Sequence, residues 1–389
     1  MIKGYIPVNL NLASIKRPDK IIYILTRIYY GRVLNETHSI NSFIPLSAKI
    51  LRFIMYDYKT PLSYLICNGI IETNNRYIVG TSSKGFRLTS LYALTDFKQV
   101  EIQDKRIINK ITKYKNKQAE EMRTIQHKHI WNCLNQIKID SDRARKFIEN
   151  AELDAERYFS YSMSIEMIEA GTWFQTVDST AGRVHNNITN LSRNLRPFLK
   201  YEGQNLIEID IANSQPFLFN ILINNYLNNH VSISNRNINL SYDVGFEKYK
   251  ELTSKGLFYE YLMKELDISE DRSLFKVRFF QKIFYGRENP NYVSKERKQF
   301  TKLFPNESEI ISFYKKDDYR QLAIKLQRAE ADIMINTIVP VLAAKGIFLL
   351  TIHDSILTTP GNAEIVKQVI LDEFQTQYGL IPTLKIKGV

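Results

Sequence analysis

The sequence predicts an α+β protein in which helices surround a central antiparallel sheet. Helical patterns fill residues 101–170. Two strand patterns, at residues 205–212 and 346–359, each carry an aspartate next to aliphatic residues. Residues 240–340, which lie between these strands, are expected to be helical throughout. We therefore expect one sheet that carries both acids and is flanked by helices.

The composition indicates a folded protein with a polyanionic partner. Of the 389 residues, 44% are hydrophobic and 24% are charged, which is far from the composition of disordered chains. The 53 Lys and Arg residues exceed the 41 Asp and Glu residues, and the net charge is +12. This excess favours nucleic acid as the partner, ahead of an anionic membrane.

Cysteine usage and hydropathy predict a soluble protein of the cytoplasm. Cys67 and Cys133 are the only cysteines, too few for a disulfide framework or a Cys-rich zinc site. Residues 1–20 lack the apolar core of a signal peptide. The most apolar stretch, Ile335–Ile352, is interrupted by a proline and a lysine, so we expect no membrane span.

The first predicted domain, residues 1–100, has a pattern that resembles a winged helix. Its expected elements are two helices joined by a short turn and then three strands: Leu46–Tyr58, Thr60–Gly69, Gly69–Glu72, Arg76–Val79 and Gly85–Leu88. The resemblance implies that the helix over Pro61–Cys67 lies in a DNA groove and that Lys84 and Arg87 contact phosphates. Winged helices also serve as protein docking modules, so that alternative stays open.

A helical connector, residues 101–170, forms the second predicted region. Its first helix carries a series of basic residues: Lys105, Arg106, Lys110, Lys113, Lys115 and Lys117. This series fits either a solvated helix face or a surface that follows phosphates. A second helical run extends over Asp140–Ile168. His127 and His129 are two residues apart, which does not place them on one helical face, so we expect no metal there.

Two carboxylates in the third region, residues 171–389, are the candidate metal ligands. Asp210 lies on a strand whose isoleucines point to the opposite face, and an ionised acid among aliphatic neighbours needs a cation or a donor. Asp354 lies at the tip between two apolar strands. Acids from separate strands can hold two Mg²⁺ ions, with Mn²⁺ as a substitute, in the two-metal arrangement of nucleotide polymerisation.

Residues 171–389 also resemble the palm and fingers of family A polymerases, the DNA polymerase I type, and of the single-subunit phage RNA polymerases. Four blocks match in the family's order: Thr180–Arg183 with Asn190-Leu191, Asp210–Gln215, Arg272–Gly286 and Ile352–Ser355. The resemblance implies a right-hand fold whose palm carries the sheet. Residues 240–340 would be the fingers, and the helices before residue 171 would supply the thumb.

The resemblance implies roles for residues at the metal site and along the primer and template. Asp210, the backbone carbonyl of Ile211, and Asp354 would be the metal ligands. Arg183 would read the minor groove at the primer terminus, and His353 would lie near the primer end. Two further residues, Asn190 and Gln327, would contact the primer and template.

The third block would bind the incoming nucleotide. Arg272 and Lys276, four residues apart on one helical face, would grip the triphosphate, and Lys276 would protonate the leaving pyrophosphate. Phe280 and Tyr285 complete the expected nucleotide site. Lys276 and Tyr285 are nine residues apart, one more than the family's usual eight, which leaves the register of Tyr285 open. Two nearby cations compete for the phosphate role: Arg278 and Lys282.

Two residues give opposite indications of whether the nucleotide substrate carries deoxyribose or ribose. Gln215 stands where family A DNA polymerases have a Glu that blocks the ribose 2′-hydroxyl, and its length favours deoxynucleotides. Ser355 follows the catalytic Asp as it does in the single-subunit RNA polymerases. We consider DNA synthesis the leading prediction, ahead of RNA synthesis.

The predicted function is a DNA-dependent DNA polymerase without proofreading that replicates a plasmid, phage or other mobile element. Its partners would be primer-template DNA and nucleoside triphosphates, with origin DNA or a replication protein on residues 1–100. The alternatives are a primase or RNA polymerase on the same fold, a non-catalytic DNA-binding replication initiator, and a two-metal nuclease.

Overall fold

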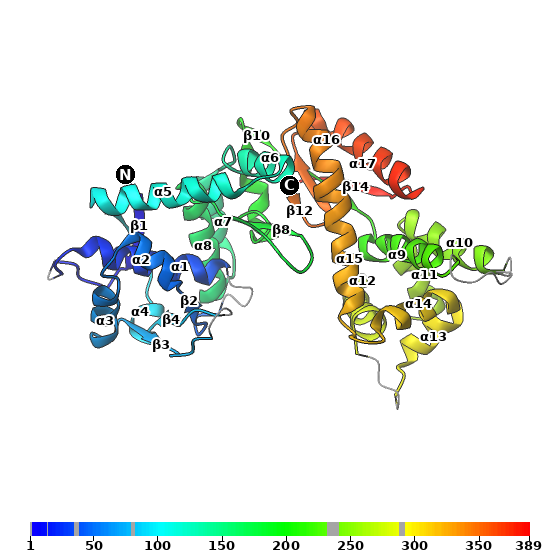
Figure 1. The fold of residues 1–389 in the computed structure, drawn as a ribbon, viewed down its shortest axis with the longest axis horizontal. Coiled ribbons are helices and arrows are strands. Elements are labelled where there is room, and N and C mark those ends of the chain that lie inside the picture. Colours follow the sequence, from blue (N-terminus) through cyan, green and yellow to red (C-terminus); the bar gives the residue numbers. More distant parts are fainter. Residues whose placement is uncertain (1, 14, 35–38, 79–81, 232–240, 288–291) are drawn as a thin grey trace. The chain divides into compact units, whose positions relative to one another are not determined.

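The computed structural model describes the chain apart from residues 1, 14, 35–38, 79–81, 232–240 and 288–291. The chain divides into two compact units (Figure 1). The first contains Met1–Phe174 and Asn186–Gly203, and the second contains Gln175–His185 and Gln204–Val389. The finer division of the first unit at residue 100 stays a prediction, and strand β5 (Phe97–Ile102) extends across that position.

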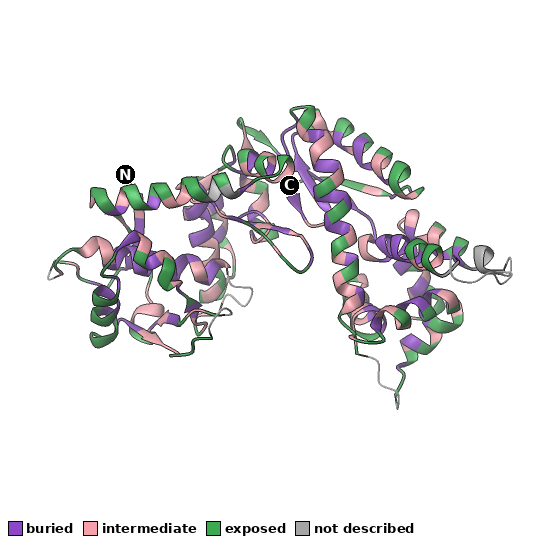
Figure 2. Ribbon diagram, viewed as in Figure 1, coloured by how far each residue is buried: buried purple, intermediate pink, exposed green. Residues whose placement is uncertain are grey.

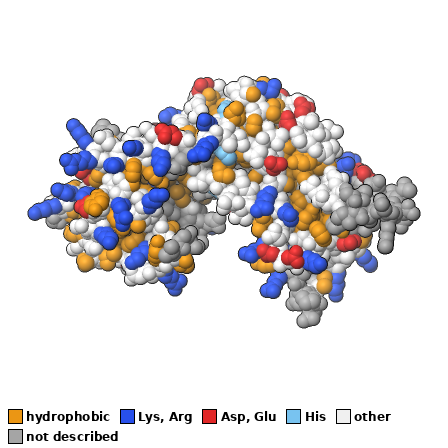
Figure 3. Space-filling model, viewed as in Figure 1, with side chains coloured by type: hydrophobic (Ala, Val, Ile, Leu, Met, Phe, Trp, Pro, Cys, Tyr) orange, Lys and Arg blue, Asp and Glu red, His pale blue; other side chains and the backbone are white. Residues whose placement is uncertain are grey.

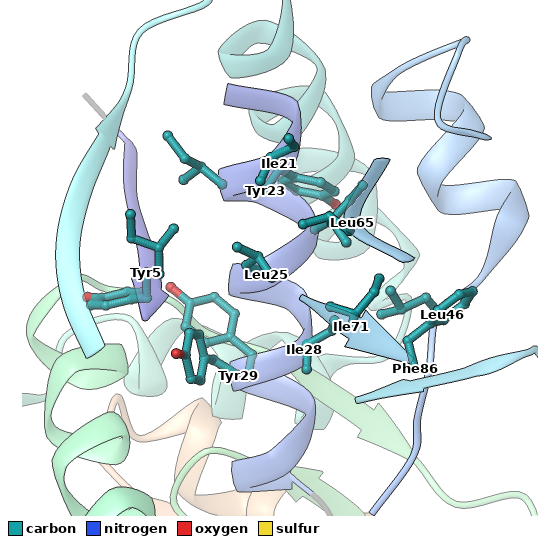
Figure 4. Close-up of a cluster of buried hydrophobic side chains, with 14 of the residues drawn as sticks. Tyr5, Ile21, Tyr23, Leu25, Ile28, Tyr29, Leu46, Leu65, Ile71 and Phe86 are labelled. Atoms are coloured by element: carbon teal, nitrogen blue, oxygen red, sulfur yellow. The ribbon is translucent and has the colours of Figure 1, made fainter. Parts of the chain in front are cut away.

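The first unit is built around helix α1 (Pro18–Leu34). Strand β1 (Ile2–Pro7) pairs antiparallel with β5 and contacts α1. Figure 4 shows apolar side chains of α1 packed between Tyr5 of β1 and a second group of buried residues: Leu46, Leu65, Ile71 and Phe86. The helix is therefore buried on most of its circumference, which explains why its apolar residues do not follow a single stripe.

The predicted helix pair of the first unit is confirmed, but one predicted strand is wrong. The elements are β2 (Ile44–Pro45), α2 (Ala48–Ile54), α3 (Lys59–Cys67), β3 (Ile71–Thr73) and β4 (Gly85–Leu88), with strand order β2-β4-β3. Arg76 and Tyr77 are not in a strand, Ile78 makes only an isolated bridge to Ser82, and Val79 lies outside the described residues. The chain leaves the sheet early because the side chain of Asn74 accepts hydrogen bonds from the backbone N–H groups of Arg76 (3.1 Å) and Gly85 (3.0 Å).

Arg87 has partners within the first unit, and its expected phosphate contact stays a prediction. Its guanidinium pairs with Glu72 on the neighbouring strand (2.8 Å) and donates to the carbonyl oxygen of Asn41 (2.7 Å). It also lies over the ring of Phe43, 4.3 Å from the centroid. Lys84 is exposed. The charge of Arg87 is therefore matched by a cross-strand ion pair within the first unit.

The helical connector consists of four helices: α5 (Lys105–Glu121), α6 (Ile125–Leu134), α7 (Ser141–Asn150) and α8 (Ala155–Glu169). The predicted run over Asp140–Ile168 is thus two helices. It breaks because Asp154 caps α8 by accepting from the backbone N–H of Arg157 (2.8 Å). The other elements of this unit are α4 (Ser90–Ala93), β6 (Lys138–Ile139), η1 (Arg193–Phe198) and β9 (Leu199–Tyr201).

The second unit contains the predicted antiparallel sheet. Its strand order is β12-β13-β11-β14, formed by Leu350–Ile352, Ser355–Thr358, Ile207–Ile211 and Leu384–Gly388. Strands β12 and β13 are buried along their whole length (Figure 2), and helix α17 (Ala363–Tyr378) contacts β11. Short elements complete this part of the unit: β7 (Gln175–Val177), β8 (Val184–Asn186), β10 (Gln204–Asn205) and η4 (Pro360–Asn362).

Between strands β11 and β12, every element that the structure describes is helical. These are α9 (Ser214–Val231), α10 (Ser241–Ser254), α11 (Phe258–Glu265), α12 (Arg272–Phe279), η2 (Phe280–Phe284), α13 (Lys295–Leu303), α14 (Pro305–Lys315), α15 (Gln321–Ala331), η3 (Asp332–Ile338) and α16 (Val339–Ala344). Segments η2 and η3 are π-helical and extend α12 and α15 without a break. Across the described chain, no helix combines the length and the apolar character needed to cross a membrane.

Candidate active site

The sheet of the second unit brings the two predicted aspartates to neighbouring positions. Asp210 on β11 lies directly opposite Ser355 on β13. Asp354 precedes Ser355 in the two-residue turn after β12, where His353 has a left-handed backbone with φ 54°. Opposite residues of antiparallel strands lie about 5 Å apart. Burial, followed by the negative charge of Asp354, raises the pKa of Asp210 to about 6.

The last strand of the chain adds two lysines beside these acids. Lys385 lies opposite Asp210, and Lys387 lies opposite Glu208, with which it forms an ion pair of 3.1 Å. The hydroxyl of Ser355 donates to the buried carboxylate of Glu208 (2.9 Å). Sequence reasoning missed both lysines, although the alternation of Lys with aliphatic residues in β14 indicates a strand with a basic face.

Two cations on helix α12 share one face, as predicted. Arg272 and Lys276 both lie over the ring of Tyr259, 5.2 Å and 5.4 Å from its centroid. Arg272 also donates to Glu260 (2.6 Å) and to the side chain of Asn213 (3.0 Å). Burial and the charge of Arg272 lower the pKa of Lys276, while Asp354 and Asp210 oppose this shift.

The competing cations on the same helix are placed differently. Arg278 pairs with Glu270 (2.8 Å) and Glu296 (3.5 Å), so two carboxylates already neutralise its charge. Lys282 is exposed on the π-helical segment η2. Of the four candidates, Arg272 and Lys276 alone lie over the Tyr259 ring, and Lys276 lies within the electrostatic influence of both aspartates.

The π-helical turn accounts for the extra residue before Tyr285. The backbone N–H of Tyr285 donates to the carbonyl of Phe280, five residues earlier (2.7 Å), and their rings stack with centroids 5.0 Å apart at 11°. The Tyr285 hydroxyl donates to Oε1 of Gln215 (2.9 Å). A β-carbon on Gly286 would lie 1.9 Å from the carbonyl oxygen of Gln281, so the turn requires glycine there.

A buried carboxylate, Glu330 of α15, joins the predicted residues into one network. Its Oε2 accepts from the guanidinium of Arg183 (2.6 Å) and from Nε2 of Gln215 (2.7 Å), and only 2% of the residue is exposed. Burial raises the pKa of Glu330 to about 7, and Arg183 opposes this shift. Sequence reasoning missed Glu330. The available signal is an acid between Ala329 and Ala331 on a helix.

The other predicted site residues occupy varied positions. His353 lies edge to face with His185, with ring centroids 6.3 Å apart. Gln327 is half-buried on α15, three residues before Glu330. Ile211 pairs with β14. Asn190 belongs to the first unit and accepts from the Thr189 hydroxyl (3.3 Å), so its role beside the other residues stays a prediction.

The oxygen donors at the sheet fit magnesium. Carboxylates of Asp210 and Asp354 and the carbonyl of Ile211 are hard ligands, the kind that Mg²⁺ prefers. Within the described residues, no group of three or more His, Cys, Asp or Glu residues is placed to hold a metal. Mg²⁺ commonly takes one or two carboxylates and completes its shell with water and substrate phosphates, so two aspartates suffice.

Comparisons with known proteins find similarity to solved structures but none to a sequence family. No protein-family model and no curated protein sequence matches the chain. Among solved structures, the chain is similar to the POL domain of Pol1 from M. smegmatis, which was solved in complex with DNA primer-template and dNTP. The TM-score is 0.39 at 14% identity, over 64% of this chain and 55% of that chain. The chain thus spans about half the length of that structure.

Proposed function

We propose that the chain is a template-directed nucleotidyltransferase, a DNA polymerase whose chemistry takes place on the sheet of the second unit. The observation that carries this proposal is the placement of Asp210 and Asp354. The pairing of β11 with β13 puts them at neighbouring positions, and Lys276 lies within their electrostatic influence. The resemblance to family A polymerases assigns metal binding to both aspartates.

The residues around the aspartates support a division of roles. Asp210, Asp354 and the carbonyl of Ile211 would hold two Mg²⁺ ions, which activate an attacking hydroxyl and stabilise a leaving pyrophosphate. Arg272 and Lys276, whose positions are fixed over the Tyr259 ring, bind the triphosphate. The lowered pKa of Lys276 makes its ammonium a better proton donor to the pyrophosphate.

Contacts of two residues favour deoxynucleotides. Gln215 receives a hydrogen bond from Tyr285, which holds its side chain as a barrier where the resemblance puts the sugar. Ser355 donates to Glu208, and this structural contact accounts for the serine without any reference to sugar choice. DNA synthesis therefore stays ahead of RNA synthesis. Extension that needs rNTPs and starts without a primer would instead favour the primase or RNA polymerase.

The first unit supplies the attraction to nucleic acid in this proposal. It contains 29 Lys and Arg residues against 18 Asp and Glu residues, a net charge of +11. Basic side chains are spread over this unit in the view of Figure 3. The order of helix, strand, helix, helix, strand and strand from α1 to β4 also fits a winged helix. We propose that this unit binds duplex DNA for a polymerase that replicates a mobile element and does not proofread.

The decisive experiment is primer extension by purified protein on a primed DNA template, with dNTPs or rNTPs and Mg²⁺. We expect Asp210→Asn and Asp354→Asn each to abolish incorporation while DNA affinity stays near that of the unsubstituted protein. Asp372→Asn, an exposed acid on α17, is the matched control and should extend normally. Full extension by both site variants would refute the two-metal proposal. DNA binding without any incorporation by the unsubstituted protein would favour the non-catalytic initiator, and degradation of the template would favour the nuclease.

A further inference from the structure

Glu330 is a buried acid that has no role in the proposed function. Its carboxylate is 2% exposed and lies between the cation of Arg183 and the amide of Gln215. An ion pair buried to this degree is costly to form and does not by itself stabilise a fold. A role in the site would account for its presence.

The hydrogen bonds fix the orientation of the Gln215 amide. Oε2 of Glu330 accepts from the guanidinium of Arg183 and so carries no proton, which means that the group of Gln215 facing this oxygen is the NH₂ group. The amide oxygen therefore faces Tyr285, whose hydroxyl must donate to it. The result is a continuous chain of hydrogen bonds from Tyr285 through Gln215 to Glu330, which Arg183 completes from the other side. Tyr285 in turn stacks on Phe280.

We propose that Glu330 is a positioning residue for sugar selection, which holds Gln215 and Tyr285 as a rigid barrier to a ribose 2′-hydroxyl. This inference rests on the proposed function, because it takes the sugar to lie against Gln215. A side chain held by hydrogen bonds at both ends of its amide cannot rotate away without breaking one of them, and a bond to a charged acceptor is the stronger of the two. Glu330 thus acts through Gln215 and does not touch the nucleotide.

The network admits one carboxylate between Arg183 and Tyr285. A second carboxylate at position 215 would lie within hydrogen-bond distance of Glu330, where two like charges cannot both stay ionised at low cost. Removing the only carboxylate would leave Arg183, whose side chain is 19% exposed, without its anionic partner. Positions 215 and 330 are therefore coupled, and exchanging their side chains should preserve the charge count.

The test compares single-nucleotide incorporation of dNTP and rNTP by four proteins: unsubstituted, Glu330→Gln, Gln215→Glu and the exchanged double variant. We expect Glu330→Gln to lower the ratio of kcat/KM for dNTP to that for rNTP roughly tenfold, mainly through better use of rNTP. Gln215→Glu alone should lower incorporation of both nucleotides. The double variant should recover most of the original dNTP/rNTP ratio, a rescue that a merely structural contact would not give.

Glu309→Gln, an exposed position on α14, is the control and should keep the original ratio. Thermal unfolding of each variant shows whether it folds. The ratio of kcat/KM for dNTP to that for rNTP is measured within one protein, so a smaller fraction of active molecules does not change it. A Glu330→Gln protein with an unchanged ratio, or a double variant no better than Gln215→Glu, would overturn the role of Glu330 while leaving the polymerase intact. An unsubstituted protein that incorporates neither nucleotide would overturn the proposed function itself.

Discussion

The two units of this protein differ strongly in net charge. The first unit has a net charge of +11, whereas the second has 24 Lys and Arg residues against 23 Asp and Glu residues, a net charge of +1. Helix α5 of the first unit exposes basic side chains along its length: Lys105, Arg106, Lys110 and Lys113. In the second unit, two cations at the candidate site are paired with carboxylates: Arg183 with Glu330 and Arg272 with Glu260.

This difference suggests two roles for cations: those on the surface of the first unit attract a polyanion, and those at the candidate site of the second unit hold a fixed geometry. Unpaired surface cations attract a polyanion over a distance, and salt screens them. Cations paired in a partly buried network hold a fixed geometry and respond little to salt. We therefore expect ionic strength to act on DNA affinity through the first unit, and point substitutions in the second unit to act on chemistry.

The largest effect is expected from neutralising the basic face of α5. Replacing Lys105, Arg106, Lys110 and Lys113 with Ala removes four candidate phosphate contacts, and the slope of log K against log salt should fall by about 3 to 4. Unsubstituted protein should then lose roughly 100-fold more affinity than the variant between 50 and 200 mM salt. Fluorescence anisotropy with duplex DNA measures both slopes.

The control for this variant removes four exposed lysines of the second unit: Lys264, Lys295, Lys298 and Lys302. It should change the slope by about 1 or less. Equal slope changes in the two variants would show that the division of charge between the units has no consequence for binding.

The next effect concerns the π turn of the second unit. Gly286→Ala puts a β-carbon 1.9 Å from the Gln281 carbonyl, so the turn must open, at a cost of about 2 kcal/mol in the free energy of unfolding. Tyr285 should then lose its contact with Gln215, and primer extension should fall while DNA affinity is kept. Urea unfolding and primer extension measure the two effects. Gly361→Ala, where a β-carbon meets no atom within 4 Å, should be silent in both assays.

This turn shows what the sequence could and could not predict. The strands that carry Asp210 and Asp354 were predictable, because alternation along a strand and an acid at a hairpin tip are local signals. The extra residue before Tyr285 was visible, but its accommodation by an i→i+5 hydrogen bond depends on packing of the whole helix. For the same reason, the face of α15 that puts Glu330 against Gln215 could not be found from spacing. The ion pair of Arg87 with Glu72 could not be predicted, because the register of β3 against β4 depends on where Asn74 ends the strand.

A pH effect is expected from Glu307, a fully buried acid in the first turn of α14 with no side-chain hydrogen bond within the described residues. Burial raises its pKa to about 7, above the unfolded value of about 4.5. The stability it contributes is therefore fully present below about pH 4.5 and is lost as the pH rises through 7. Glu307→Gln should unfold like the unsubstituted protein at pH 4.5 and be about 3 kcal/mol more stable at pH 8.5. Equal stability differences at both pH values in urea titrations would contradict this.

The smallest effect belongs to the first unit. Asn74→Ala removes two hydrogen bonds that close the loop between β3 and β4, and the free energy of unfolding should fall by about 1 kcal/mol. Primer extension at saturating DNA should stay unchanged, because the proposed chemistry takes place in the second unit. Hydrogen exchange of the Gly85 amide, which should accelerate, measures the local loss. Slower extension at saturating DNA would break the proposed separation of the two units.

Metal binding at Asp210 and Asp354 can be measured directly. Mn²⁺ substitutes for Mg²⁺ at oxygen ligands and is counted by electron paramagnetic resonance. In the presence of dNTP and a primer that cannot be extended, we expect two bound Mn²⁺ ions per chain, and a clear loss in both Asp210→Asn and Asp354→Asn but not in Asp372→Asn. Mn²⁺ binding by both site variants at the level of the unsubstituted protein would show that these two aspartates do not hold the metal ions.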